Sequence, residues 1–290
     1  MAGPLVAEEL DRLLAVAVEA ADAGAEVLLR WFRHADLEGG EKELNDFVTQ
    51  ADRESEQAIL DVILGHFPSH AVLAEESGVG GGVSGGSADE VGYQWIVDPL
   101  DGTANFLHGL PVFCISIACR YGDEIVAAVI DDPLKNDRFT ARLGGGAFWN
   151  GKAMSVSGLD SAQGAFLATG FPFRAKPALE LYLGLFQDVF QQARGIRRCG
   201  AAALDLAFTA AGVFDGFFEF RLSPWDLAAG ILLVKEAGGT VTDLDGGGNM
   251  LDAGNVIAGG SGVHGSLLHM VRDRGLSQAT LDGLNGLDPS

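Results

Sequence analysis

The chain has 290 residues, a formal net charge of −21 and 48% hydrophobic residues, which is typical of a globular protein with one large domain or two halves. Such an acidic surface repels nucleic acid, so we expect no direct nucleic-acid partner, and an anionic substrate would need bound cations. No apolar run is long enough for a membrane span, and Glu8 and Glu9 lie where an export signal needs positive charge. Three cysteines fit a reducing compartment better than a disulfide framework. We therefore expect a cytoplasmic protein with no membrane association.

Apolar periodicity divides the first half of the chain into helices and then strands. In chain order, the expected elements are a helix over 5–33, a helix from about 50 to His66, strands over 71–74 and 95–98, a hairpin of 112–120 with 124–131, and strands near 137–142 and 147–149. Thr49 and Asp52 have the spacing of a capping box at the start of the second helix. The stretch 78–92 is rich in Gly and Ser, which is typical of a long surface loop.

The second half of the chain alternates strands with helices. The expected elements are a strand near 165–169, helices over 177–193 and 202–212, a strand over 214–220, a helix over 224–236, strands near 240–243 and 255–258, and a helix over 262–273. The tail after Gly275 is polar and predicted to be weakly ordered. Interleaved strands and helices indicate layers of helix and sheet. We place the boundary between an N-terminal half, 1–152, and a C-terminal half, 153–290, in the loop region that follows the short strands.

Two carboxylates, Asp98 and Asp101, follow the central apolar strand. Pro99 cannot donate a backbone hydrogen bond, so the strand is expected to stop at Asp98. Gly102 lets a ligand approach the main chain, and Thr103 has a position typical of a helix N-cap. Residues of these types also form ordinary turns, which composition alone leaves open. Two acids followed by free amides are otherwise suited to divalent cations and a phosphate.

The sequence Asp-Pro-Leu-Asp-Gly-Thr-Ala-Asn-Phe at 98–106 resembles the signature of the inositol monophosphatase family, which belongs to the lithium-sensitive, magnesium-dependent phosphatases. Two further motifs agree with this family: Trp-Asp at 225–226 with Glu-Ala-Gly-Gly at 236–239, and Lys-x-x-x-Asp-x-Val-Thr-x-x-Asp at 42–52. The Asp-x-Asp-Gly-Thr motif of haloacid-dehalogenase phosphatases matches less well, because there one residue separates the two acids and here two do. The resemblance covers roughly positions 42–260, and it is closest to the bacterial type.

The resemblance implies two or three Mg²⁺ ions per site. The implied metal ligands are Glu75, Asp98 and the Leu100 carbonyl for one ion, Asp98, Asp101 and Asp226 for a second, and Glu75 for a weaker third. The residues alone leave simpler readings open. Glu75 and Glu76 also fit an acidic loop, and the Ser-Pro-Trp-Asp sequence that ends at Asp226 is a good helix start without any chemistry.

The resemblance also implies catalytic and substrate-binding residues. The catalytic residues would be Glu75, Thr103 and Asp52, with Asp52 hydrogen-bonded to Thr103 so that the pair orients and helps deprotonate a metal-activated water. The implied substrate-binding residues are Lys42, Gly102, Thr103, Gly200, Ala201, Glu219 and Asp226. The family often has Ser or Thr at the position of Ala201, so only backbone contacts are expected there. Asp52 could also serve only as a helix cap.

The family resemblance implies an α/β (α+β) fold, the layered α-β-α-β-α sandwich of the sugar-phosphatase type. It implies a lithium-sensitive enzyme that hydrolyses myo-inositol 1-phosphate to inositol and phosphate by in-line attack of water, without a phosphoenzyme. Fructose 1,6-bisphosphate and nucleotide bisphosphates are alternative substrates, although Ala104-Asn105-Phe106 favours inositol phosphate. A homodimer is implied as well. The alternative function is a non-catalytic role as a protein partner of the transcription antitermination machinery, which bacterial relatives of this type can serve.

Overall fold

The structure of the chain is a computed structural model that describes residues 6–37, 39–43, 46–80, 92–172 and 178–284. The helices are α1 Ala7–Trp31, α2 Gln50–His66, α3 Thr103–Leu107, α4 Leu179–Gln192, α5 Ala202–Ala210, α6 Pro224–Glu236, α7 Met250–Ala253, α8 Ser261–Asp273 and α9 Gln278–Leu284. The strands are β1 Gly39–Glu43, β2 Asp46–Thr49, β3 Ala71–Ala74, β4 Gly78–Gly80, β5 Tyr93–Asp101, β6 Cys114–Tyr121, β7 Glu124–Asp132, β8 Asp137–Arg142, β9 Gly146–Trp149, β10 Lys152–Ala153, β11 Phe166–Thr169, β12 Gly195–Arg197, β13 Gly216–Glu219, β14 Thr240–Thr242 and β15 Val256–Gly259.

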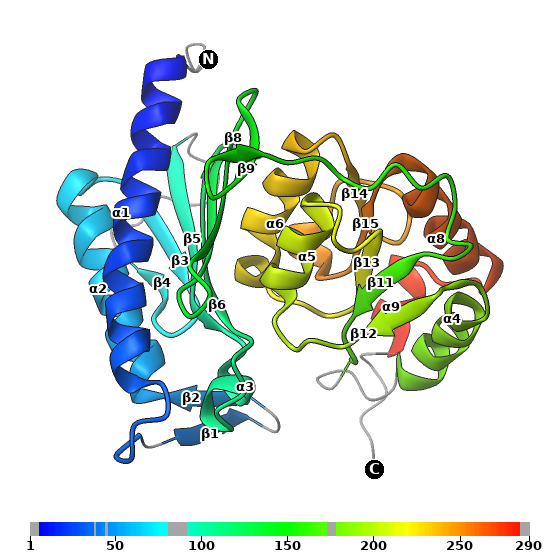
Figure 1. Cartoon of the computed structure of the whole chain (residues 1–290), viewed down its shortest axis with the longest axis horizontal. Helices are drawn as coiled ribbons and strands as arrows, with labels where there is room; N and C mark the ends of the chain where they lie inside the picture. Colours follow the sequence, from blue (N-terminus) through cyan, green and yellow to red (C-terminus); the bar gives the residue numbers. More distant parts are fainter. Residues whose placement is uncertain (1–5, 38, 44–45, 81–91, 173–177, 285–290) are drawn as a thin grey trace.

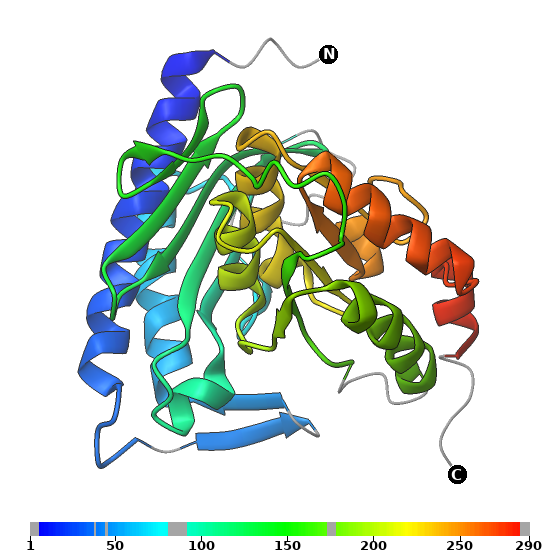
Figure 2. The same cartoon turned by 45° about the vertical axis from the view of Figure 1, so that its right-hand side comes forward.

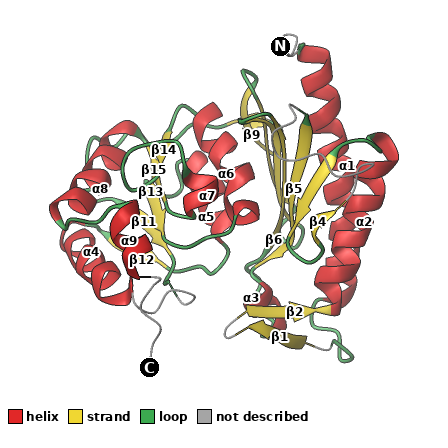
Figure 3. Ribbon diagram, turned by 180° about the vertical axis from the view of Figure 1, so that it is seen from behind, coloured by secondary structure: helices red, strands yellow, loops and turns green. Residues whose placement is uncertain are grey.

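These elements form five layers. Figure 1 shows α1 and α2 on one face of a large sheet, α5 and α6 between that sheet and a smaller one, and α4 and α8 on the outer face of the smaller sheet. The strand order is β10-β9-β8-β7-β6-β5-β3-β4 in the large sheet and β12-β11-β13-β15-β14 in the small one. The view from behind gives the same order of layers (Figure 3). The expected α-β-α-β-α sandwich is therefore confirmed.

The sequence of each helix matches its layer. In α1, the small and apolar residues that include Leu13, Ala17 and Ala20 are buried, and the opposite face is exposed. A methyl group on Gly24 would lie 2.9 Å from Ile115 and Ile59, so this glycine lets α1 approach the sheet and α2 closely. In α6, every residue in 227–234 is buried, as expected for a helix that has a sheet on each side.

The pairing of β3 and β5 brings two acids together. These strands are parallel, and Ala74 lies opposite Val97. Glu75 and Asp98 therefore leave the same edge of the sheet side by side, which agrees with the family resemblance that made both of them ligands of one ion. The Glu75 N–H donates to the Val97 carbonyl at 3.2 Å, so the alignment persists past the last paired residues.

Several predictions of local structure are wrong. β5 does not end at Asp98 but continues to Asp101, with an irregular register between the two. The missing N–H of Pro99 is tolerated because it lies in this bulge. Gly102, not Thr103, is the N-cap of α3. Residues 78–80 form β4, whereas 81–91 of the predicted loop lie outside the described residues.

The ends of the two halves also differ from the expectation. The tail after Gly275 carries α9, whose Leu281 is buried.

The small hairpin of β1 and β2 lies beside α3 at the base of the large sheet (Figure 2). The predicted division at 152/153 falls inside β10, and α6 packs on strands of the first half. The division remains a prediction. None of the helices in the described part of the chain combines the length and the hydrophobicity that a membrane span requires.

Candidate active site

A cavity of about 180 Å³ opens between the end of β5 and the start of α6. Its walls contain most of the predicted site residues, namely Glu75, Asp98, Leu100, Asp101, Gly102, Thr103, Gly200, Ala201, Glu219 and Asp226. Asp52 lies behind the cavity wall and reaches it through Thr103. The backbone of Lys42 belongs to β1, but its side chain lies outside the described residues. The structure thus brings together residues from both halves of the chain.

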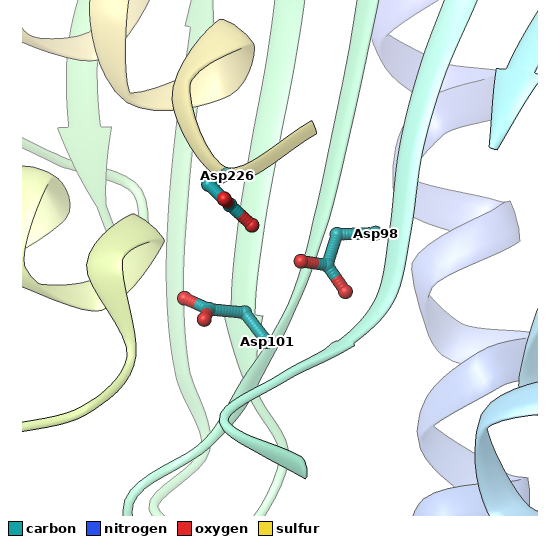
Figure 4. A group of neighbouring side chains, drawn as sticks. All are labelled: Asp98, Asp101 and Asp226. Atoms are coloured by element: carbon teal, nitrogen blue, oxygen red, sulfur yellow. The ribbon is translucent and has the colours of Figure 1, made fainter. Parts of the chain in front are cut away.

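Three carboxylates form the centre of this cavity. Each of Asp98, Asp101 and Asp226 offers an oxygen atom that lies within 4.8 Å of the others. Figure 4 shows the first two on β5 and the third at the start of α6, with their carboxylates turned toward one another. Among the described residues, Glu75 lines the same cavity but lies outside this close group.

Backbone amides hold each of the three carboxylates in place. The Leu100 N–H donates to Asp98 at 3.0 Å, which fixes the turn around Pro99. The Ser223 N–H donates to Asp226 at 2.7 Å as part of the capping box of α6. The predicted helix start is therefore present, and the capping carboxylate faces the cavity as well.

Asp101 is held by an amide that the sequence did not single out. The Ala203 N–H, in the first turn of α5, donates to Asp101 at 2.7 Å. Gly200 and Ala201 were predicted to contact substrate through their amides, and both line the cavity. The Asn105 amide donates to the carbonyls of Val112 at 2.8 Å and Cys199 at 3.0 Å. The bond to the Cys199 carbonyl joins α3 to the segment that leads into α5.

Burial and mutual repulsion make the carboxylates hard to ionise. Burial raises the pKa of Asp98 well above its ordinary value, and the negative charges of Glu75, Asp101 and Asp226 raise it further. Burial, followed by the charge of Asp226, raises the pKa of Asp101 to about 7. Carboxylates this close are not all charged at neutral pH unless a cation neutralises them. Their oxygen donors and their excess negative charge fit a hard divalent cation.

Asp52 and Thr103 form the second part of the site. The Thr103 hydroxyl donates to Asp52 at 2.9 Å and also lies 3.0 Å from the Leu100 carbonyl. The other oxygen of Asp52 accepts the Thr49 N–H at 2.9 Å and the Thr49 hydroxyl. The capping box and the bond to Thr103 therefore coexist. Burial raises the pKa of Asp52, and its bonds to the two threonines lower it.

Gly102 is required by its backbone and its surroundings. Its φ is +97°, and an added methyl group would lie 2.9 Å from the Val112 carbonyl. Thr103 is the first residue of α3, and the first amides of a helix have no partner within the helix. Gly102 and Thr103 thus form a closely packed part of the cavity wall next to the carboxylates, with small side chains and backbone amides.

Sequence reasoning missed three charged residues near the cavity. Arg198 and Arg221 line it, and Asp205 is buried on α5. Burial raises the pKa of Asp205 to about 8, although the Cys199 thiol hydrogen-bonds to it and lowers that pKa. Burial and the charge of Asp205 raise the pKa of Glu219. Two of the three had a signal in the sequence: Asp205 is a lone acid between apolar residues, and Arg198 follows Arg197 directly in a strongly acidic chain.

Replacing Gly170 by alanine is expected to impair substrate binding. A methyl group there would lie 1.8 Å from a carboxylate oxygen of Glu219, so the Glu219 side chain would have to leave its place in the cavity wall. We expect the KM for the substrate to rise by about tenfold or more, because losing one good hydrogen bond weakens binding by about this factor. Steady-state kinetics of the Gly170→Ala variant check this, and Gly158→Ala, with no atom near the added methyl group and no positive φ, shows the effect of a remote glycine change. An unaltered KM in Gly170→Ala would contradict the role of Glu219.

The five layers and the carboxylate cluster between the two sheets define a fold of the sugar-phosphatase class. The chain belongs to the inositol monophosphatase family, whose model matches residues 9–276. It is 44% identical over 263 residues to the Nus factor SuhB of Pseudomonas aeruginosa, and the aligned region covers 90% of this chain and 96% of that protein. The family predicted from the sequence is confirmed.

Two solved structures agree with this result. The extragenic suppressor protein suhB of Bartonella henselae superposes with a TM-score of 0.84 at 40% identity, over 90% of this chain and 98% of that one. The inositol monophosphatase of Anabaena superposes with a TM-score of 0.80 at 36% identity, over 91% of this chain and 97% of that one. The first of these structures carries the name of an extragenic suppressor protein and the second the name of an enzyme.

Proposed function

We propose that the protein is a magnesium-dependent phosphomonoesterase that hydrolyses inositol monophosphate. The observation that carries this proposal is the close group of Asp98 and Asp101, which are buried, and Asp226, which is partly buried; it lines one small cavity together with Gly102 and Thr103. The carboxylates are suited to cations, and the start of α3 is suited to the phosphate. Family membership agrees with this chemistry.

The proposed metal ligands are those named from the sequence. Glu75, Asp98 and the Leu100 carbonyl would hold one Mg²⁺, Asp98, Asp101 and Asp226 a second, and Glu75 a weaker third. When bound, such ions lower the pKa of water and stabilise negative charge on phosphoryl oxygens. Lithium sensitivity is expected from the same family resemblance.

Asp52 and Thr103 would handle the proton of the attacking water. Because the Thr103 hydroxyl donates to Asp52, its oxygen can accept a hydrogen bond from a water in the cavity. The buried carboxylate of Asp52, with its raised pKa, is a suitable final acceptor of that proton. Lys42 would add a positive charge near the phosphate.

The substrate's polyol part would lie against Glu219 and the segment at Gly200 and Ala201. Glu219 can accept hydrogen bonds from ring hydroxyls, and a cavity of about 180 Å³ has room for a small phosphate ester. Ala201 is 1% exposed and offers no side-chain hydroxyl, so the contact there would use backbone groups.

The deciding experiment is phosphate release from myo-inositol 1-phosphate, with and without Mg²⁺. Magnesium-dependent release that is inhibited by lithium supports the proposal. If the folded protein releases no phosphate, fructose 1,6-bisphosphate and nucleotide bisphosphates are tested next. Activity on those substrates alone would correct the substrate, and inactivity on all of them would reject the enzymatic proposal.

A second function is favoured by the names of the relatives, which include Nus factor SuhB. We propose as the alternative a non-catalytic, protein-mediated role in transcription antitermination, which would place the chain in the cytoplasm. A homodimer is proposed with either function. Pull-down with a catalytically inactive variant tests the alternative, because loss of every specific partner would reject it, and light scattering measures the mass of the particle.

Mg²⁺ is expected to stabilise the protein more at pH 8 than at pH 5. The folded-state pKa of Asp101 is raised from 3.8 to about 7, so the metal-free folded protein binds more protons than the unfolded chain between these values. Its stability therefore falls as the pH rises through this window. Bound Mg²⁺ would remove the repulsion that causes this loss. Thermal unfolding with Mg²⁺ and with EDTA at both pH values checks this, and equal gains in Tm would contradict it.

A further inference from the structure

The segment between β13 and α6 forms one wall of the cavity and contains a strained residue. It joins Glu219 to Asp226, and Phe220, Arg221 and Leu222 line the cavity with them. Arg221 has a φ of +64°, in the left-handed region that disfavours a residue with a Cβ atom. A strained backbone at a functional site persists only when its surroundings hold it in place.

Backbone contacts from the start of β15 provide part of this support. The Arg221 N–H donates to the side-chain oxygen of Asn255 at 3.1 Å, and the Leu222 N–H donates to the Gly254 carbonyl at 2.7 Å. An added methyl group on Gly254 would lie 2.3 Å from the Leu222 carbonyl oxygen. Asn255 is completely buried, so the two segments are closely packed here.

The other part of the support comes from the C-terminal helix α9. The Arg221 guanidinium donates to the Leu281 carbonyl at 2.7 Å and lies 3.6 Å from the Asp282 carboxylate. The Asn255 amide donates to the side chain of Gln278 at 2.6 Å. The same helix therefore holds both the side chain of the strained residue and the residue that binds its backbone.

We propose that α9 is a clamp on the substrate cavity, and that Arg221 is the positioning residue through which it acts. The guanidinium holds the chain in the left-handed conformation, and this conformation places Glu219 and Asp226 on the same wall. The inference deepens the proposed function, on which it rests, because the wall in question would contact the substrate. It gives the last described helix of the chain a role in substrate affinity.

Two substitutions at position 221 distinguish the effect of the backbone conformation from the effect of the side chain. Arg221→Ala removes the guanidinium and keeps the Cβ atom that makes the conformation costly. Arg221→Gly removes both, and glycine adopts a positive φ without strain. We expect Arg221→Ala to raise KM for inositol 1-phosphate by about tenfold, the effect of losing one good hydrogen bond, with a smaller change in kcat. In Arg221→Gly, we expect KM to stay within about twofold of the KM of the unmodified protein, because glycine adopts the positive φ without strain.

Amide hydrogen exchange supplies a readout that needs no activity. Both variants should exchange faster than the unmodified protein in α9, because both lose the tie to Leu281. Only Arg221→Ala should exchange faster in 219–226. The matched control is Arg274→Ala, which removes an arginine that binds Asp188 with two contacts of 2.6 Å and that does not contact the cavity segment. It should leave KM and exchange in 219–226 unchanged.

The outcomes decide the proposal in either direction. If both variants at position 221 keep the original KM and the original exchange in 219–226, the clamp is wrong. If both raise KM equally, the guanidinium acts on the substrate directly, and the backbone role is wrong. If the protein releases no phosphate from any substrate, the proposed function fails, and exchange in 219–226 still decides whether α9 holds this segment.

Discussion

Asp98→Asn is expected to abolish turnover and leave the protein folded. Asp98 is the carboxylate that both proposed metal sites share, and a neutral amide cannot neutralise two cations. We expect kcat/KM to fall by at least about a thousandfold, the scale of losing a central electrostatic group of a catalytic site. The metal-free variant should be at least as stable as the unmodified protein, because the substitution removes a carboxyl group whose ionisation is opposed by burial and by the charges of its neighbours.

Phosphate release and thermal unfolding without metal measure the two effects of Asp98→Asn. The control is Asp132→Asn, which changes another buried aspartate, one that accepts the N–H groups of Leu134 and Lys135 in a turn. It does not line the cavity, so its activity should persist even if its stability falls. An Asp98→Asn enzyme with normal magnesium-dependent turnover would refute the assignment of the metal ligands.

Asp52→Asn is expected to lower kcat by about a hundredfold, the lower end of what a general base contributes, while KM stays nearly constant. Asp52 uses one oxygen for Thr103 and the other for the Thr49 N–H, whereas asparagine has a single acceptor oxygen. That oxygen can still accept the Thr49 N–H, so α2 keeps its cap, while the NH2 group faces Thr103 and can donate to its hydroxyl. Asparagine cannot take the proton that Thr103 would pass on. The loss should therefore appear in kcat and not in Tm, and steady-state kinetics together with thermal unfolding check this.

Thr49→Ala is the matched control for Asp52→Asn. It removes a capping hydroxyl, at a cost of about 1 kcal/mol of stability, and leaves the bond between Asp52 and Thr103 in place. Activity should stay close to that of the unmodified protein. If Thr49→Ala loses as much activity as Asp52→Asn, the role of Asp52 is structural, and the proton-transfer assignment is wrong.

Local patterns predicted the parts of the site that depend on neighbours in sequence. The capping box at Thr49 and Asp52, the helix start at Asp226 and the turn at Gly102 all follow from spacing and residue type. The alignment of Glu75 with Asp98 could be expected as soon as two short strands were seen to end in acids. The order of layers came from the family resemblance, because periodicity does not say which strands pair.

The errors arose where distant contacts decide the outcome. Pro99 stays within β5 because a bulge accommodates it. Periodicity located α4 but not its buried face: Leu183 and Phe190 are 45% and 66% exposed, whereas Tyr182 and Val189 are buried. Arg221 gave no signal in the sequence, because its left-handed backbone depends on α9 and β15, which lie later in the chain.

The central position of α6 has a consequence for the order of synthesis. One face of the large sheet is covered by α1 and α2, which precede all of its described strands in the chain. The other face, which includes Ile96 and Ile130, packs in the core that contains α5 and α6, made some hundred residues later. At about 5–20 residues per second, this apolar face stays uncovered on the ribosome for on the order of ten seconds. The nascent chain therefore has to be protected from aggregation during this interval.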